Sequence, residues 1–230
     1  MHTRSLRRPL LALNIALTAA VCVLNYFYQL LDFNYPLKCC ASACFALIGI
    51  IDLLCARRTK QADIGLYRLL CLGVVFAMLG DIAINPSFVA GAALFAAGHV
   101  FLVAAYCVAH PLRRSDFLFI VPAVAGSMAF MLCYPHFSFP HPAFYGICIG
   151  YAAVIAVMLG KSAANFCRRR RLFEGLLVLG SALFFFSDVM LLLHWFVGKW
   201  SWTNHACMAA YYPAVCLMGL AMYAKMRETE

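Results

Sequence analysis

The chain has 230 residues, of which 65% are hydrophobic and 12% are charged, and its formal net charge is +9. A typical soluble protein has roughly 45–50% apolar and about 25% charged residues, so this chain has too few polar side chains to cover a soluble fold. The composition also excludes a disordered chain, a collagen and a nucleic-acid-binding protein. It indicates a polytopic membrane protein.

Eight apolar segments are long enough, or nearly so, to cross a hydrocarbon core of about 30 Å, which takes about 20 helical residues. We predict helices over residues 9–31, 36–55, 65–84, 88–109, 116–133, 143–163, 172–196 and 204–225. The apolar runs are continuous rather than alternating, which favours helices over a β-barrel. The sequence therefore predicts an all-α bundle of eight transmembrane helices that forms a single domain, residues 1–230.

The first apolar segment follows three arginines and contains ALTAA at residues 16–20, a pattern that resembles a signal peptide. The apolar run continues to Leu31 and seven more spans follow, so we predict an uncleaved first helix. Sixteen of the 18 lysines and arginines lie on the side of the termini, and only Lys38 and Lys199 lie on the other. Because cytoplasmic loops are enriched in these residues, both termini are predicted to be cytoplasmic. The run 168–171 is expected to anchor the chain to anionic headgroups.

Two aspartates lie well inside the predicted helices, in a repeated pattern. LGVVFAMLGD ends at Asp81 and LGSALFFFSD ends at Asp188, so Leu-Gly precedes each aspartate by the same spacing. Sixteen residues along its predicted helix, each lies about 24 Å from the cytoplasmic edge. Carboxyl groups at that depth are costly unless they face a polar interior, which makes them functional candidates. The structural alternative is a pair of acids that bond to hydroxyls and lock the bundle.

Other polar residues are expected near the same depth, where they could form one cavity that opens outward. Each alone also fits an interfacial aromatic residue or a packing hydrogen bond. These residues are Asn25, Asn85, Tyr151, Ser181, Tyr211 and Tyr212.

The histidines and serines give weaker signals. His99 lies alone in the middle of its helix, about 10 Å deeper than the aspartates when each residue rises 1.5 Å. No H-x-x-x-H, H-E-x-x-H or C-x-x-C spacing occurs, so neither a metal site nor a cofactor is expected. Ser187 adjoins Asp188, but the chain has no G-x-S-x-G elbow.

Several blocks, taken in order, resemble the YhhN-like lysoplasmalogenase family. They are LGDIAI (79–84), GAALFAAGHVFLVAAY (91–106), YAAVIAVM (151–158), GSALFFFSDVMLL (180–192) and AAYY (209–212). The chain departs from the family pattern at Leu102, where a tyrosine is common, and at Val215, where a glutamine is common. The Lys-Pro opening of the second helix appears here only as Pro36-Leu37-Lys38.

The resemblance implies an eight-helix, cofactor-free membrane hydrolase that cleaves the vinyl ether bond of lysoplasmalogens. The products are a fatty aldehyde and a glycerophospho-ethanolamine or -choline. It assigns Asp81 and Asp188 to acid, base or cation-stabilising roles, as carboxyl pairs act in glycoside hydrolysis. His99, Tyr151, Tyr211, Asn85 and Ser187 are the expected substrate-binding residues.

Two other classes of function fit the same residues. A proton-coupled transporter would use the acid pair as a relay and would have helices broken in mid-membrane. If the protein is instead a non-catalytic membrane scaffold, the equal predicted depths of Asp81 and Asp188 are accidental. The expected partners are a lysophospholipid substrate and the lipid bilayer, with no nucleic acid, and the oligomeric state stays open. The small size and the lack of an appended domain favour a bacterial inner membrane.

Overall fold

The computed structural model describes residues 2–228, and Met1, Thr229 and Glu230 lie outside the described part. Its helices are α1 (His2–Leu30), α2 (Tyr35–Arg58), α3 (Ile64–Ala83), α4 (Phe88–Ala109), the short 3-10 helix η1 (Arg114–Asp116), α5 (Phe117–Cys133), α6 (Pro142–Arg168), α7 (Leu172–Phe196) and α8 (Ser201–Glu228). Eight of these segments are long and apolar enough to cross a membrane. The predicted all-α architecture of eight membrane-spanning helices is confirmed.

The observed helix ends differ from the predicted ones mainly where a helix continues into polar sequence. Helices α4 and α7 have the predicted bounds, whereas α6 continues five residues further, to Arg168. Its polar residues Lys161 and Asn165 are buried. Asn165 donates to the Tyr106 carbonyl oxygen at 2.9 Å. The falling hydropathy at this end therefore reflects partners within the protein and does not mark the end of the helix.

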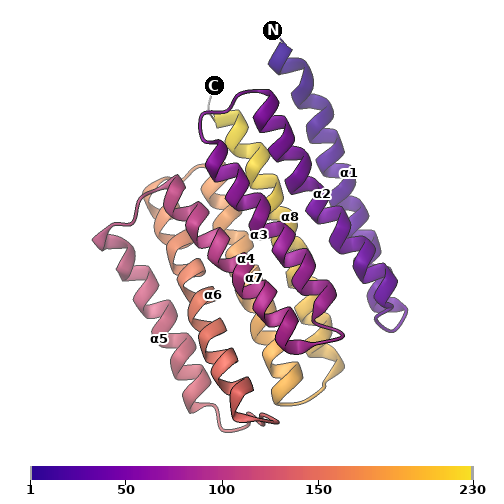
Figure 1. The fold of residues 1–230 in the computed structure, drawn as a ribbon, viewed down its shortest axis with the longest axis vertical. Helices are drawn as coiled ribbons and strands as arrows, with labels where there is room; N and C mark the ends of the chain where they lie inside the picture. Colours follow the sequence, from indigo (N-terminus) through magenta and orange to yellow (C-terminus); the bar gives the residue numbers. More distant parts are fainter. Residues whose placement is uncertain (1, 229–230) are drawn as a thin grey trace.

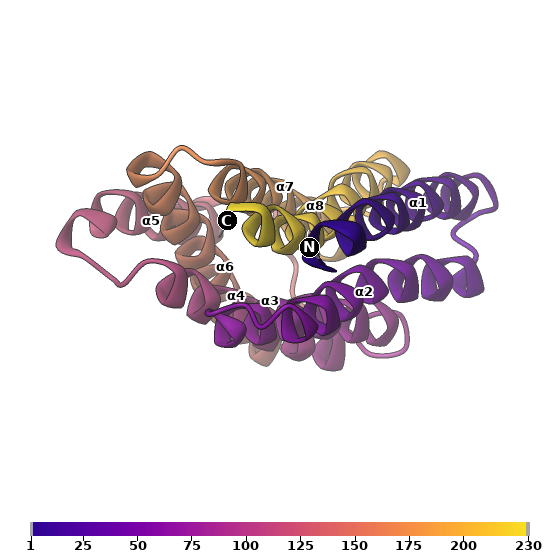
Figure 2. The ribbon, with the colours of Figure 1, turned by 90° about the horizontal axis from the view of Figure 1, so that it is seen from above.

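The helices lie side by side in an elongated bundle, with both ends of the chain at the same end of it (Figure 1). Seen from above, α2, α3 and α4 form one row and α1, α8 and α7 form another, with α5 and α6 at one side (Figure 2). Helix α8 packs against α1, α2, α3 and α7. It is therefore the central element on which the two rows meet.

Helices α3 and α4 approach each other closely because both carry a glycine at the crossing. A Cβ atom at Gly98 would lie 3.1 Å from the carbonyl oxygen of Gly73. Small residues at such crossings let membrane helices pack backbone to backbone. This contact fixes the position of α3, which carries Asp81, relative to α4, which carries His99.

A buried network of charged groups joins the helices at the end that carries the termini. The Asp116 carboxylate forms ion pairs with Lys161, at 2.7 Å, and with Arg168. Lys161 also donates to the His110 carbonyl oxygen at 2.8 Å, and the His110 ring lies 2.9 Å from Glu174. Arg168, the first residue of the run expected to anchor the chain to headgroups, is partly buried and pairs with Asp116. The side chains of Arg4 and Arg7, which also entered the orientation argument, lie outside the described part.

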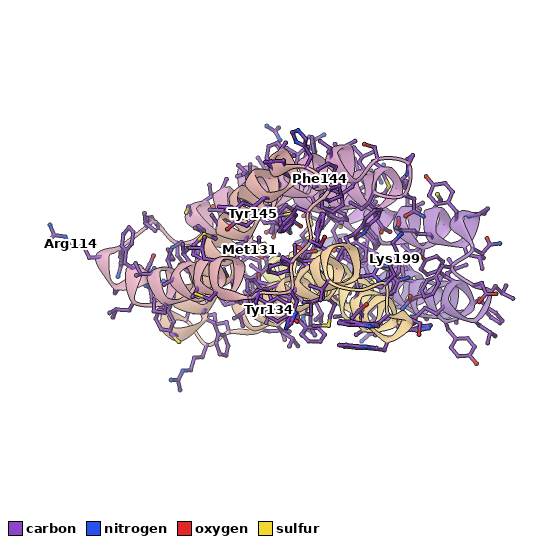
Figure 3. All side chains as sticks on the ribbon, turned by 90° about the horizontal axis from the view of Figure 1, so that it is seen from below. Arg114, Met131, Tyr134, Phe144, Tyr145 and Lys199 are labelled. Carbon is purple, nitrogen blue, oxygen red and sulfur yellow. The ribbon has the colours of Figure 1, made fainter. Side chains whose placement is uncertain are left out.

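The opposite end of the bundle carries a cluster of aromatic rings. Figure 3 shows this end from below, with Tyr134, Phe144 and Tyr145 at the connection between α5 and α6. The ring of Phe139, in this connection, lies 4.5 Å from that of Phe196 at the end of α7. The Ser138 amide donates to the Phe196 carbonyl oxygen at 2.7 Å. Aromatic side chains gather in this way at membrane–water interfaces.

Candidate active site

Asp81 lies on α3, two residues before the helix ends, and only 2% of its surface is exposed. Its Oδ1 atom forms an ion pair with the Lys38 Nζ atom at 3.1 Å. Its Oδ2 atom accepts hydrogen bonds from the Ser42 hydroxyl, at 2.5 Å, and from the Tyr212 hydroxyl, at 3.2 Å. The carboxylate is thus held by one positive charge and two neutral donors, which compensate its burial.

Lys38 contacts Asp81 and was not among the candidate site residues, since the sequence analysis used it only as a charge on the outer side and as part of the altered Lys-Pro opening. It is 2% exposed, and besides Asp81 it donates to the Asn85 Oδ1 atom at 2.7 Å. A signal was present in the sequence, because Ser42 follows Lys38 by four residues and so shares its helix face. A lysine within an apolar helix that has a polar residue one turn further indicates a buried partner.

Asp188, on α7, has different neighbours. Its Oδ2 atom accepts a hydrogen bond from the Tyr151 hydroxyl at 2.6 Å and lies 3.3 Å from the His99 Nε2 atom. The same histidine nitrogen lies 2.9 Å from the Tyr151 hydroxyl, so the three side chains form a closed triangle. Among the described residues no lysine or arginine forms an ion pair with Asp188.

The expectation that His99 lies much deeper than the aspartates is wrong for Asp188, although His99 does lie deeper than Asp81, which is two residues from the end of α3. The predicted depths were counted from the cytoplasmic end of each helix, on the assumption that all helices have the same length. Helix α7 continues eight residues beyond Asp188, and His99 lies eleven residues into α4 from the same end of the bundle. Measured from that end, the two positions differ by about 4.5 Å at 1.5 Å per residue, which side chains can span.

One cavity of about 240 Å³ is lined by both aspartates and is referred to below as the polar cavity. Of the other residues expected to bind substrate, Asn85, Ser187 and Tyr211 also line it. Tyr151 and His99 do not line it, but both contact Asp188, which does. The cavity lies at the end opposite the termini, because it is lined by Phe33 and Asn85, in two connections there, and by Asn204 in the first turn of α8.

The remaining polar residues considered from the sequence make separate contacts. Ser181 lies 2.9 Å from the Tyr106 hydroxyl, and Asn25 donates to the Met208 carbonyl oxygen at 3.4 Å. The Tyr211 hydroxyl donates to the Ala77 carbonyl oxygen, so it is Tyr212 that bonds Asp81. The two departures from the family pattern, at Leu102 and Val215, are buried core residues that do not line the polar cavity.

The described residues contain no group of three His, Cys, Asp or Glu side chains that could hold a metal ion. What the polar cavity offers is two carboxyl groups in unlike surroundings, one beside a buried ammonium and one beside a phenol and an imidazole. Pairs of acids whose environments differ in this way are suited to divide the roles of proton donor and anionic base.

The YhhN family model matches residues 33–222, which is more than half of the chain. No curated protein and no solved structure matches it significantly. The chain belongs to the YhhN family, and the matched range contains both aspartates and all the residues that contact them.

Proposed function

We propose that this YhhN-family protein is a lysoplasmalogenase, which hydrolyses the vinyl ether bond of a lysoplasmalogen within the membrane. Family membership supports a lysoplasmalogenase-like hydrolase. The observation that carries the proposal is that Asp81 and Asp188, from different helices, line one polar cavity at the end of an apolar helix bundle. The products are a fatty aldehyde and a glycerophospho-ethanolamine or -choline.

The reaction needs a proton donor and a stabilised cation. A proton adds to the vinyl carbon farther from the ether oxygen, and the positive charge is shared between the other vinyl carbon and that oxygen. Water then adds to the carbon that bears the oxygen and forms a hemiacetal. Collapse of the hemiacetal breaks its bond to the glycerol oxygen, which takes a proton and leaves as the alcohol. One water is consumed, and the proton it releases restores the donor.

The surroundings of the two aspartates suggest a division of these roles. Lys38 places a positive charge 3.1 Å from Asp81, which stabilises the carboxylate form of that residue. Asp81 is therefore the candidate for stabilising the cation and activating water. Asp188, which has no lysine or arginine partner among the described residues, is the candidate proton donor, and Tyr151 and His99 orient its carboxyl group. Glycoside hydrolases use carboxyl pairs in this manner around a related cation.

The continuity of the helices that carry the acids favours a hydrolase over a transporter. Transporters bind their coupling ions at helices that are broken in mid-membrane. Helix α3 is continuous from Ile64 to Ala83, and α7 from Leu172 to Phe196, and neither contains a proline.

The proposal is tested with the purified protein and a lysoplasmalogen, with aldehyde release as the readout. The matched saturated ether lysolipid, which cannot form the cation, serves as the substrate control. Asp81→Asn and Asp188→Asn keep size and hydrogen bonding and should each lower turnover at least about a hundredfold, given the 10²–10⁴ range of general acid–base catalysis. Asp63→Asn, at an exposed position before α3, should leave turnover unchanged.

Three results would contradict the proposal. If the folded wild-type protein releases no aldehyde from any lysoplasmalogen, the reaction is wrong. If either aspartate variant keeps near-normal turnover, the two-carboxylate mechanism is wrong. Movement of protons or lysolipid across vesicles that depends on both aspartates, without aldehyde release, would show a transporter.

A further inference from the structure

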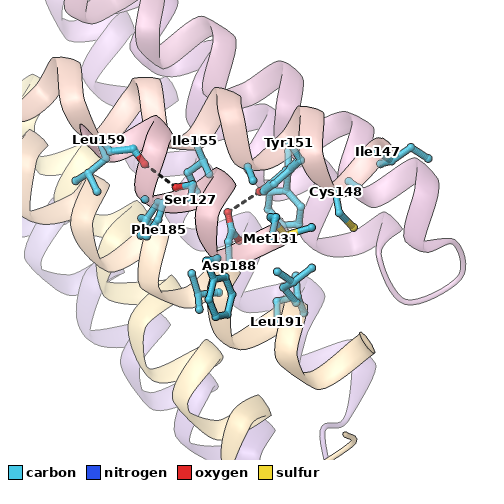
Figure 4. Close-up of a pocket in the computed structure, with 18 of the residues that line it drawn as sticks. Ser127, Met131, Ile147, Cys148, Tyr151, Ile155, Leu159, Phe185, Asp188 and Leu191 are labelled. Atoms are coloured by element: carbon cyan, nitrogen blue, oxygen red, sulfur yellow. Dashed lines mark hydrogen bonds between the residues drawn. The ribbon is translucent and has the colours of Figure 1, made fainter. Parts of the chain in front are cut away.

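A second cavity, of about 380 Å³, lies beside Asp188 and is bounded by α4, α5, α6 and α7. Figure 4 shows it in close-up, with Tyr151 and Asp188 joined by a hydrogen bond. Its volume is within the range of roughly 300–1,000 Å³ that small-molecule sites have. This cavity is called the apolar cavity below.

The apolar cavity exists because α5 stands apart from the core of the bundle. Among the described residues α5 contacts α6 and η1 but no other helix. The space that it leaves toward α4 and α7 is therefore lined by side chains of four helices without being filled by them. Pro122 and Gly126 of α5 are exposed and also line the cavity, so its wall on that side is accessible from outside the bundle.

Three of the residues that line the apolar cavity are polar: Ser127, Tyr151 and Asp188. The Ser127 hydroxyl donates to the Ala123 carbonyl oxygen of its own helix at 2.9 Å. The Tyr151 hydroxyl is bonded to Asp188. The other lining residues are hydrophobic residues, a proline and a glycine. Such a cavity suits a hydrocarbon chain, and the one carboxyl group in its described lining is Asp188 of the candidate active site.

The two cavities meet at Asp188, which lines both, as do Ile84, Phe95 and Leu191. The polar cavity lies toward the end opposite the termini. The apolar cavity is lined along α6 from Ile147 to Leu159, about 18 Å at 1.5 Å per residue, and so it continues past Tyr151 toward the end with the termini. A single-chain lipid that stands in one leaflet has the same order, with its headgroup at the interface and its chain directed into the bilayer.

Gly126 is placed to control how far a chain can enter. Helices α5 and α6 are antiparallel, and a Cβ atom at Gly160 would lie 2.5 Å from the Ile120 Cα atom, which fixes their register. Gly126, six residues further along α5, is then level with residue 154. Along the axis of α6, Gly126 is therefore about 4.5 Å beyond the level of Tyr151, on the side nearer the termini. A Cβ atom at Gly126 would meet no atom within 4 Å, so a side chain there would occupy cavity space without a clash.

We propose that the apolar cavity binds the hydrocarbon chain of a single-chain lipid, and that the absence of a side chain at Gly126 sets the length of chain accepted. This inference rests on the proposed function for the identity of the bond at Asp188. With the chain in the apolar cavity and the headgroup in the polar cavity, the bond that joins them lies beside that carboxyl group. A chain in the bilayer is already in hydrocarbon, so the selection among chains is steric, by exclusion of those that do not fit.

The test is Gly126→Phe, with Gly150→Phe as the matched control. A Cβ atom at Gly150 also meets nothing within 4 Å, but Gly150 does not line the apolar cavity. Each folded variant is assayed for aldehyde release from lysoplasmalogens with chains of about four and about sixteen carbons, of which only the longer passes the level of Gly126. Binding of the saturated ether lysolipids of the same lengths, which cannot be cleaved, is measured in parallel. Ala152→Leu narrows the cavity from α6 and serves if Gly126→Phe fails to fold.

We expect Gly126→Phe to lower kcat/KM and binding for the long chain by about tenfold or more, as filling of a specificity pocket does. The short chain should change by less than about twofold, and Gly150→Phe should leave both lengths unchanged. An equal effect on both lengths, or none, would overturn the inference even if aldehyde release still depends on the two aspartates. Length-selective binding that Gly126→Phe abolishes, in a protein that releases no aldehyde, would support the chain site and contradict the proposed reaction.

Discussion

Replacement of Lys38 by methionine is the most informative single change in the candidate site. The substitution keeps the length and the apolar part of the side chain and removes only the ammonium group. In the native protein this group lies 3.1 Å from the Asp81 Oδ1 atom and donates to Asn85, and both Lys38 and Asp81 are 2% exposed. Lys38→Met therefore leaves a buried carboxylate without its positive partner.

The size of the effect follows from the distance and the burial. At 3.1 Å and an effective dielectric constant of about 20, the Coulomb attraction is about 5 kcal/mol. Removal of one member of a buried ion pair typically costs about 3–5 kcal/mol of folding free energy. We expect Lys38→Met to lose stability in this range, unless Asp81 takes up a proton and loses the charge that the reaction uses. Turnover should fall at least about a hundredfold in either case.

The assay compares thermal unfolding and aldehyde release of four proteins: wild type, Lys38→Met, Asp81→Asn and the double variant. The double variant has no unpaired charge, so it should recover most of the stability that Lys38→Met loses, while both remain inactive. Lys199→Met is the control, because Lys199 lies at the same end of the bundle but is exposed. Near-normal turnover of Lys38→Met, together with an inactive Asp81→Asn, would refute the assignment of Asp81 as the ionised acid.

Three further predictions concern Asp188, the inner charge network and the orientation. Tyr151→Phe removes the hydroxyl that donates to Asp188 at 2.6 Å and should lower turnover about 10- to 100-fold, because a buried acceptor left without its partner costs roughly 1–3 kcal/mol. Tyr145→Phe, outside both cavity linings, should have no effect, and equal turnover of the two variants would contradict the role of Tyr151. Lys161→Met breaks the buried ion pair with Asp116 and should lower the free energy of unfolding by about 3 kcal/mol, the low end for such pairs because Arg168 remains paired with Asp116. Turnover per folded molecule should be unchanged. A loss of turnover at full thermal stability would show instead that this network takes part in catalysis. A reporter fused to the carboxyl terminus should be active on the cytoplasmic side, as the distribution of lysine and arginine predicts, and activity only on the outer side would contradict that orientation.

The amino-acid sequence by itself determined the existence and order of the eight helices and drew attention to Asp81 and Asp188. Helix length and position follow from local hydropathy, because each span of a bilayer requires about 20 apolar residues. In hydrocarbon the backbone N–H and C=O groups must also hydrogen-bond within the segment, which favours a helix. The aspartates stand out because a carboxyl group in such a helix is costly anywhere. Both properties are local, so no knowledge of the neighbouring helices is needed to read them.

Only the tertiary structure decided which side chains meet. Helices that are apolar on all sides carry little signal about which face points inward, so the pairing of Lys38 with Asp81 was missed. The contact between His99 and Asp188 depends on where each helix ends, which places the two residues at similar depth although the spans differ in length. The apolar cavity depends on α5 packing, among the described residues, against α6 and η1 but not against α4 or α7, a feature of packing that no segment of the sequence encodes alone.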